Sequence, residues 1–90
     1  MHTQKIAERV SVSFVYDAMK ALSYPRTVVW NGRLYPITKV GLHHTYRQGS
    51  ILFHVYSVLS GELYLRLTLD SESLVWNLEE LTDMTGIVSE

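Results

Sequence analysis

Hydrophobic and polar residues alternate along several short stretches of the chain, and a period of two is typical of a half-buried β-strand. In residues 10–16, valine and aromatic residues at the even positions alternate with Ser11 and Ser13. In residues 63–69, leucines alternate with tyrosine, arginine and threonine. Both stretches are therefore predicted to be strands with one face in the core.

An Asn-Gly pair separates two short runs of β-forming residues, 27–30 and 33–35. A two-residue loop of this kind predicts a type I′ hairpin, because glycine accepts the positive φ that both loop positions need and asparagine tolerates it. The expected cross-strand pairs are Trp30 with Arg33, which would stack as a cation–π pair, Val29 with Leu34, and Val28 with Tyr35. Pro36 follows and cannot donate a ladder hydrogen bond, so we expect it at a sheet edge or a bulge.

The leucine strand is preceded by residues 51–59 across the loop 60–62, which predicts a second hairpin. Its register decides which face of the first strand is buried, because a shift of one residue exchanges the faces. A two-residue loop places His54 and Tyr56 among the leucines, whereas a three-residue loop buries Phe53 and its odd-numbered apolar neighbours. Each such side chain contributes about 1.5–3 kcal/mol when buried, which favours the three-residue loop. The outer face of this hairpin would then carry His54, Tyr56, Tyr64 and Arg66.

The remaining stretches have weaker periodicity. Residues 17–23 are expected to form a short helical turn, and the polar residues 41–50 a loop or strand margin. Residues 74–80 fit either a strand or a helical stripe, and the preceding hairpin favours the strand. Five short strands with two hairpins predict an all-β fold, a small antiparallel barrel or strongly bent roll, because closure removes exposed sheet edges.

The length of 90 residues, with 47% hydrophobic residues, predicts one domain over 1–90, with ends expected to fray at 1–8 and 84–90. The chain contains no cysteine, so neither a disulfide nor a thiolate metal site is possible. No apolar run approaches the roughly 20 residues of a membrane span, and the first residues lack the apolar stretch of a signal peptide. We therefore expect a cytoplasmic protein without a membrane partner.

The formal net charge of -1 conceals two opposed halves. Residues 1–50 carry seven basic and two acidic side chains, a formal charge of +5. Residues 51–90 carry one basic and seven acidic side chains, a formal charge of −6. Such asymmetry indicates either internal neutralisation or a basic face that the overall pI hides.

The order of landmarks along the chain resembles a family of small bacterial domains of unknown function. The landmarks are Pro25, the turn Trp30-Asn31-Gly32-Arg33 within the run 28–35, the strand 53–56, the leucine strand 63–69, and the tryptophan strand 76–78. Members of that family are sometimes encoded beside DNA-repair polymerase genes, so the resemblance implies a link with nucleic-acid metabolism. Leu42-His43-His44 stands where the family has a tryptophan followed by a basic residue. The family supplies no catalytic residues to carry over.

Residue types that perform chemistry are present without the spacing that chemistry needs. A metal site needs three or four convergent ligands, and the neighbours His43 and His44 would point to opposite sides of an extended chain. No serine lies in a Gly-x-Ser-x-Gly turn, and Glu79 and Glu80 are likewise expected on opposite faces. The sequence therefore predicts no enzyme, no metal site and no cofactor.

Two kinds of binding remain. The preferred one is protein interaction, with a partner or with a second copy as a homodimer, because aromatic and arginine residues are enriched at interfaces. The predicted interaction face consists of His54, Tyr56, Tyr64 and Arg66. The alternative is a small barrel that binds single-stranded nucleic acid, with bases stacked on rings beside basic side chains. Its candidate residues are Arg26, Arg33, Lys39, Tyr46 and Arg47, and the pI of ≈ 6.4 counts against it.

Overall fold

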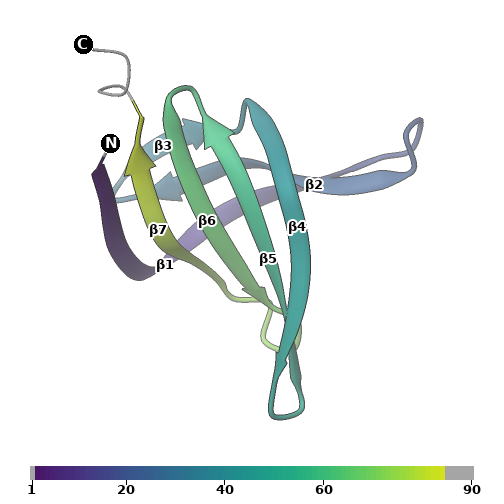
Figure 1. Ribbon diagram of the computed structural model, residues 1–90. Helices are drawn as coiled ribbons and strands as arrows, with labels where there is room; N and C mark the ends of the chain where they lie inside the picture. Colours follow the sequence, from purple (N-terminus) through teal and green to yellow (C-terminus); the bar gives the residue numbers. More distant parts are fainter. Residues whose placement is uncertain (1, 85–90) are drawn as a thin grey trace.

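The computed structural model describes residues 2–84, which form a single antiparallel sheet of seven strands (Figure 1). The order across the sheet is β3-β2-β1-β7-β6-β5-β4. The strands are β1 (His2–Asp17), β2 (Leu22–Trp30), β3 (Arg33–Pro36), β4 (Lys39–Gln48), β5 (Ile51–Ser60), β6 (Leu63–Asp70) and β7 (Trp76–Asp83). The described part of the chain contains no helix, and so none that is long and apolar enough to cross a membrane. The all-β prediction is confirmed.

The sheet bends at β1, the longest strand. Its first part pairs with β7 as far as Val10, and its second part pairs with β2 from Ser11 onward. The pairing with β7 is interrupted by a bulge between Lys5 and Glu8, where Ala7 has a φ of 52°. Bulges bend a strand and increase its twist. Consequently the second part of β1 forms, with β2 and β3, a layer behind β4 to β7 (Figure 1).

The two edge strands, β3 and β4, are not paired with each other, so the sheet is not closed into a barrel. β3 is short and ends at Pro36, which lacks an N–H donor. The N–H of Ile37 donates to the carbonyl of Arg26 (2.8 Å), and the N–H of Thr38 donates to that of Leu59 (2.8 Å). The connection thus ties the two layers together without joining their edges. The predicted barrel is wrong, and the expected edge position of Pro36 is confirmed.

The core lies on one face of the bent sheet, called here the inner face and defined by Leu65, Leu67 and Leu78. These leucines are 1%, 0% and 1% exposed. The layer of β1 to β3 covers them with Val28 and Tyr35, which are also buried. Each fully buried aliphatic side chain contributes about 1.5–3 kcal/mol, so this contact between layers is the main source of stability.

The hairpin predicted at the Asn-Gly pair is confirmed. Both loop residues have positive φ, 56° and 71°, and the strands pair in the predicted register. The side chains differ from the expectation in one respect. The guanidinium of Arg33 lies over the ring of Tyr35, 5.5 Å from its centroid, while the indole N–H of Trp30 donates to Glu8 (2.8 Å). Trp30 is turned toward β1 rather than toward its cross-strand neighbour.

The register predicted for the second hairpin is wrong. The loop has two residues, and Gly61 at its first position has a φ of 61°, as a type II′ turn requires. Tyr56 therefore lies opposite Leu67, and His54 lies opposite Leu69, both on the inner face.

Burial of apolar side chains does not decide the register of this hairpin, because both faces of β5 are covered. Val55 lies on the outer face, yet it is only 2% exposed. Phe53 stacks there on Tyr46 of β4, with the ring centroids 5.1 Å apart. The outer face thus shelters the small apolar side chains, and the larger ring of Tyr56 occupies the inner face at 7% exposure.

The turn between β1 and β2 is not helical. The strands end at the pair Asp17–Leu22, and the turn between them has Ala21 at a φ of 52°. The Oδ1 atom of Asp17 accepts the N–H groups of Met19 (3.0 Å) and Lys20 (3.2 Å). Aspartate accepts backbone hydrogen bonds in the same way at the start of a helix, but here the chain reverses direction after four residues instead of continuing as a helix.

Two further boundaries differ from the sequence-based expectation. Residues 41–48, expected in a loop or strand margin, belong to β4, because pairing with β5 orders them despite their polar composition. Residues 2–8, expected to fray, belong to β1, which gives β7 a second partner. The strand expected around Trp76 is confirmed as β7, whereas residues 85–90 lie outside the described part of the chain.

Candidate binding surfaces

Rings from four strands meet on the inner face and form what is called here the aromatic cluster: Phe14, His43, His54, Tyr56 and Trp76. Tyr56 is at its centre. The centroid of its ring is 4.4 Å from His43, 5.7 Å from Trp76 and 6.0 Å from Phe14. Phe14 and Trp76 are also in contact, at 5.7 Å. Phe14 remains 44% exposed, so the cluster reaches from the core to the surface.

The two histidines of the cluster are joined directly. Nε2 of His43 and Nδ1 of His54 are 3.0 Å apart, so one nitrogen donates to the other, and the rings are stacked 5.2 Å apart. Burial lowers the pKa of His43, and positive charge on His54 or His44 would lower it further. Burial also raises the pKa of the Tyr56 hydroxyl. His43 and Tyr56 are therefore uncharged at neutral pH.

The cluster contains two histidines, fewer ligands than a metal site needs. Within residues 2–84, no three histidine, aspartate or glutamate side chains are grouped to hold a metal ion. His44 pairs with Val55, so it lies on the outer face, opposite to His43. The arrangement offers stacked neutral rings, which pack against apolar or aromatic groups.

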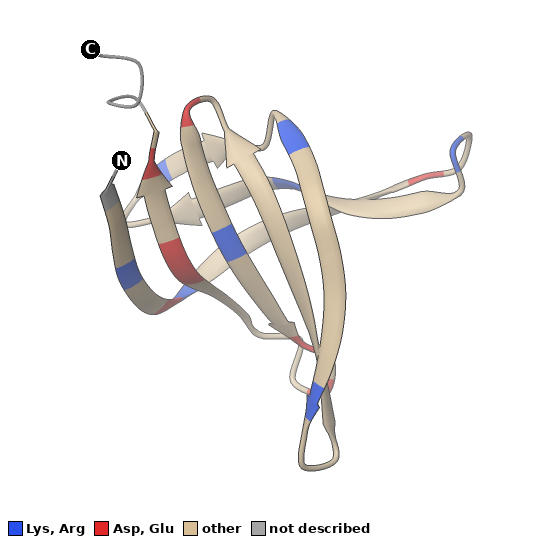
Figure 2. Cartoon of the chain, in the orientation of Figure 1, with Lys and Arg blue, Asp and Glu red and all other residues tan. Residues whose placement is uncertain are grey.

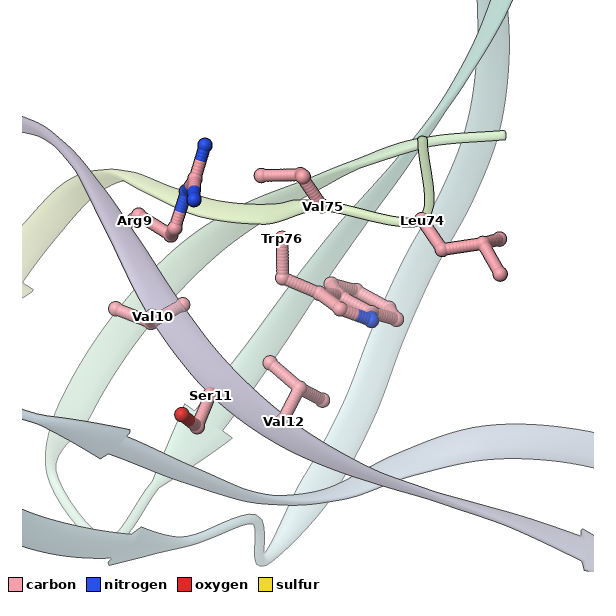
Figure 3. Close-up of a pocket in the computed structure, with 7 residues that line it drawn as sticks. All are labelled: Arg9, Val10, Ser11, Val12, Leu74, Val75 and Trp76. Carbon is pink, nitrogen blue, oxygen red and sulfur yellow. The ribbon is translucent and has the colours of Figure 1, made fainter. Parts of the chain in front are cut away.

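A shallow groove lies where β1 separates from β7 (Figure 3). Its volume is about 350 Å³, and its lining includes Arg9 and Val12 of β1 together with Leu74 and Trp76. The indole of Trp76 lies between Val12 and Leu74 (Figure 3). Leu74 is 69% exposed and has a φ of 62°. A non-glycine residue held in the left-handed region costs about 1–3 kcal/mol, and such strain is often found at binding sites.

Beyond this groove, β1 and β2 continue as a two-stranded arm that projects from the body (Figure 1). The arm is defined as residues 11–25. It exposes large apolar side chains: Phe14 is 44% exposed, Tyr16 66%, Met19 96% and Leu22 47%. Met19 lies in the turn at its tip. Phe14 and Tyr16 lie on one face of the arm, whereas Leu22, opposite Asp17, lies on the other, so the arm exposes apolar side chains on both faces.

The other unusual surface is β4, an edge strand of ten residues. Within the described chain it pairs only with β5. Every residue from Gly41 to Gln48 is exposed. β4 contains Lys39 and Arg47 but no acidic residue. A long edge such as this presents a row of unpaired backbone groups.

The predicted interaction face does not exist as one surface. His54 and Tyr56 belong to the aromatic cluster on the inner face, whereas Tyr64 and Arg66 lie on the outer face. Tyr64 donates its hydroxyl hydrogen to Ser57 (3.0 Å). Arg66 forms an ion pair with Glu80 at 2.9 Å. These outer side chains are engaged with their neighbours in the sheet.

The predicted nucleic-acid residues belong to three different strands. Arg26 and Arg33 belong to β2 and β3, at one end of the strand order, and Lys39, Tyr46 and Arg47 belong to β4, at the other end. Basic and acidic positions are interspersed over the sheet in Figure 2. The opposed charges of the two halves therefore meet within the fold, as where Lys5 of β1 lies opposite Glu80 of β7, and do not form separate poles.

Sequence reasoning missed Phe14, Trp76 and Leu74 as surface-lining residues. Alternation identified the first two as apolar strand residues, and nothing local indicated that they meet. Nothing in the sequence around Leu74 indicates its positive φ. That φ follows from the turn in which the N–H of Leu74 donates to the carbonyl of Asp70 (2.7 Å).

These surfaces must be interpreted from their geometry alone. Comparison of the chain with protein-family models, with curated proteins and with solved structures finds no match.

Proposed function

We propose that the protein is a non-catalytic interaction module that binds an extended, acidic segment of a partner polypeptide along the free edge of β4. The observation that carries this proposal is the unpaired edge itself, ten residues long and exposed from Gly41 to Gln48. Partner strands are recruited to such edges by main-chain hydrogen bonds, and side chains add specificity.

The backbone groups available for this pairing follow from the hairpin geometry. The pair that closes a two-residue loop is hydrogen-bonded, and the pairs alternate from there. Counting from the Gly49-Ser50 loop, His43, Thr45 and Arg47 direct their N–H and C=O groups away from β5 and toward the free edge. Leu52 of β5 lies opposite Arg47, and its carbonyl accepts a hydrogen bond from the N–H of Ser71 (3.1 Å), on the side of β6. This carbonyl therefore points away from β4, as the alternation requires.

The charge of β4 indicates the kind of segment. Lys39 and Arg47 lie near its two ends, two histidines lie between them, and acidic residues are absent from it. A partner strand with carboxylates meets only attraction along this edge, whereas a second copy of β4 meets like charges. The electrostatic part is exposed and is therefore weakened by salt.

The test measures the binding of a fluorescent peptide that alternates valine and glutamate, by anisotropy. Thr45→Pro removes one outward N–H without removing a donor to β5, so affinity should fall about tenfold or more. Thr45→Val is the matched control, since it keeps the N–H, and it should bind as the unmodified chain does. A peptide with lysine in place of glutamate should bind less tightly. Equal binding of both peptides, or no effect of Thr45→Pro in a protein that unfolds normally, would contradict the proposal.

Single-stranded nucleic acid is the second candidate, and one observation favours it: Tyr46 is 43% exposed beside Arg47 on the same strand. A short oligothymidine in the same assay separates the two candidates. Binding that Tyr46→Ala abolishes, that Thr45→Pro leaves intact and that falls steeply with salt would support nucleic acid instead.

A further inference from the structure

We propose that the arm is a dimerisation element: the free edge of β1 pairs antiparallel with the same edge of a second copy, and each arm tip fills the groove beside Trp76 of the other copy. This interface is distinct from the β4 edge. It leaves that edge open in both copies.

The first support is the edge. From Ser11 onward, β1 pairs only with β2 within the described chain, because its pairing with β7 ends at Val10. Residues 11–16 contain no charged residue and no proline, two devices that usually keep an edge from pairing, and the bulge beside Phe14 has its extra residue, Arg26, in β2. The opposite edge of the arm has such a device, since Pro25 lacks a donor there. The arm is therefore open to pairing on one side.

The second support is the match between the tip and the groove. Met19 is 96% exposed in the single chain, and the groove of about 350 Å³ is lined by Val12, Leu74 and Trp76. A methionine side chain is flexible and its sulfur makes favourable contacts with aromatic rings. The tip supplies an apolar group, and the groove supplies an apolar lining.

The third support is that a single two-fold rotation produces both the pairing of the two β1 edges and the contact of each arm tip with the groove. A two-fold axis at Phe14 places Asp17 of each copy opposite Ser11 of the other. The turn beyond Asp17 then lies beside Arg9 of the other copy, which lines the groove. From Phe14, the tip and the groove lie at similar distances in opposite directions along β1, about 10 Å each at the rise of a strand. The interface is thus self-complementary, as two-fold symmetry demands.

The same register is complementary in charge. The Asp17 carboxylate of one copy approaches the Arg9 guanidinium of the other, and this happens twice per dimer. Between these two contacts the paired segments are uncharged. In contrast to β4, the β1 edge therefore meets its own copy without repulsion.

The test uses analytical ultracentrifugation of the full chain over a wide range of concentrations. The unmodified chain should be in monomer–dimer equilibrium. Met19→Lys places a second positive charge beside Arg9 in the groove of the other copy and should weaken the dimer about tenfold or more. Leu34→Lys is the matched control: Leu34 is also exposed (58%), lies on β3 outside the interface, and its replacement should leave the equilibrium unchanged. Circular dichroism establishes that both variants fold.

Cross-linking tests the register independently, because the chain has no cysteine of its own. With the axis at Phe14, residue 13 of one copy lies opposite residue 15 of the other, within disulfide reach. A mixture of Ser13→Cys and Val15→Cys proteins should therefore form a mixed disulfide on oxidation. The control is Ser23→Cys, which is exposed on β2 of the same arm and should not cross-link with Ser13→Cys.

Three results would overturn the inference: a strict monomer at all concentrations, equal effects of Met19→Lys and Leu34→Lys, or a dimer that Thr45→Pro dissociates and Met19→Lys does not. The two proposals fail separately. Met19→Lys should bind the acidic peptide normally, and Thr45→Pro should dimerise normally.

Discussion

Tyr56 provides a direct test of the fold, because the two possible registers of β5 place it on opposite faces. In the structure it is 7% exposed and its ring contacts those of His43, Phe14 and Trp76. Truncating a buried aromatic side chain to alanine costs about 3–5 kcal/mol. A domain of this size has a total stability of about 5–13 kcal/mol, so Tyr56→Ala should remove a large share of it.

The assay is urea unfolding followed by circular dichroism, with thermal unfolding as a second measurement. Tyr56→Ala should lower the melting temperature by more than about 10 °C. Tyr64→Ala is the matched control on the outer face, where loss of the contact with Ser57 should cost about 1 kcal/mol. Tyr56→Phe keeps the ring and should stay within about 0.5 kcal/mol of the unmodified chain. The reasoning is refuted by a Tyr56→Ala variant that is no less stable than Tyr64→Ala.

Other outcomes follow from single positions. Because the pKa of His43 is lowered in the folded protein, its contribution to stability is complete above the ordinary value of 6.5 and is lost as the pH falls through the lowered value. Urea unfolding should therefore show stability decreasing as the pH falls below 6.5. His43→Gln should reduce that pH dependence, and an unchanged slope would argue against the assignment. Gly61→Ala forces a side chain to a φ of 61° and should cost about 1–2 kcal/mol in urea unfolding, although open space surrounds the position. Leu74→Gly should be neutral or slightly stabilising in the same assay, because glycine adopts a φ of 62° without strain and a side chain that is 69% exposed loses little packing. A loss of stability above about 1 kcal/mol would show that Leu74 packs more than its exposure suggests.

What the sequence reveals depends on how local the cause is. The Asn31-Gly32 turn and its register were predictable because two adjacent residues determine the turn type. The register of β5 was not, because apolar residues lie on both of its faces and the choice depends on rings that arrive from β1, β4 and β7. A glycine at the first loop position was the available signal for the two-residue turn.

β4 illustrates the opposite error. Its polar, histidine-rich composition shows no alternation, since an edge strand exposed on both faces is under no pressure to alternate. Its order comes from pairing with β5, which composition does not report. The candidate surfaces were missed for a related reason: an unpaired edge is a property of the completed sheet and not of the residues that form it.

The pairing of β1 with β7 has a consequence for how the chain reaches this structure. Thr3 and Thr82 are hydrogen-bonded through their hydroxyl groups at 2.9 Å although they are 79 positions apart. The β1–β2, β4–β5 and β5–β6 hairpins join sequence neighbours and are able to form early, whereas the start of β1 has to wait for the last strand. During synthesis the segment from His2 to Val10 therefore leaves the ribosome before its partner strand β7 has been made. We expect slow final closure of the sheet, and a need for protection of that segment until β7 has been made.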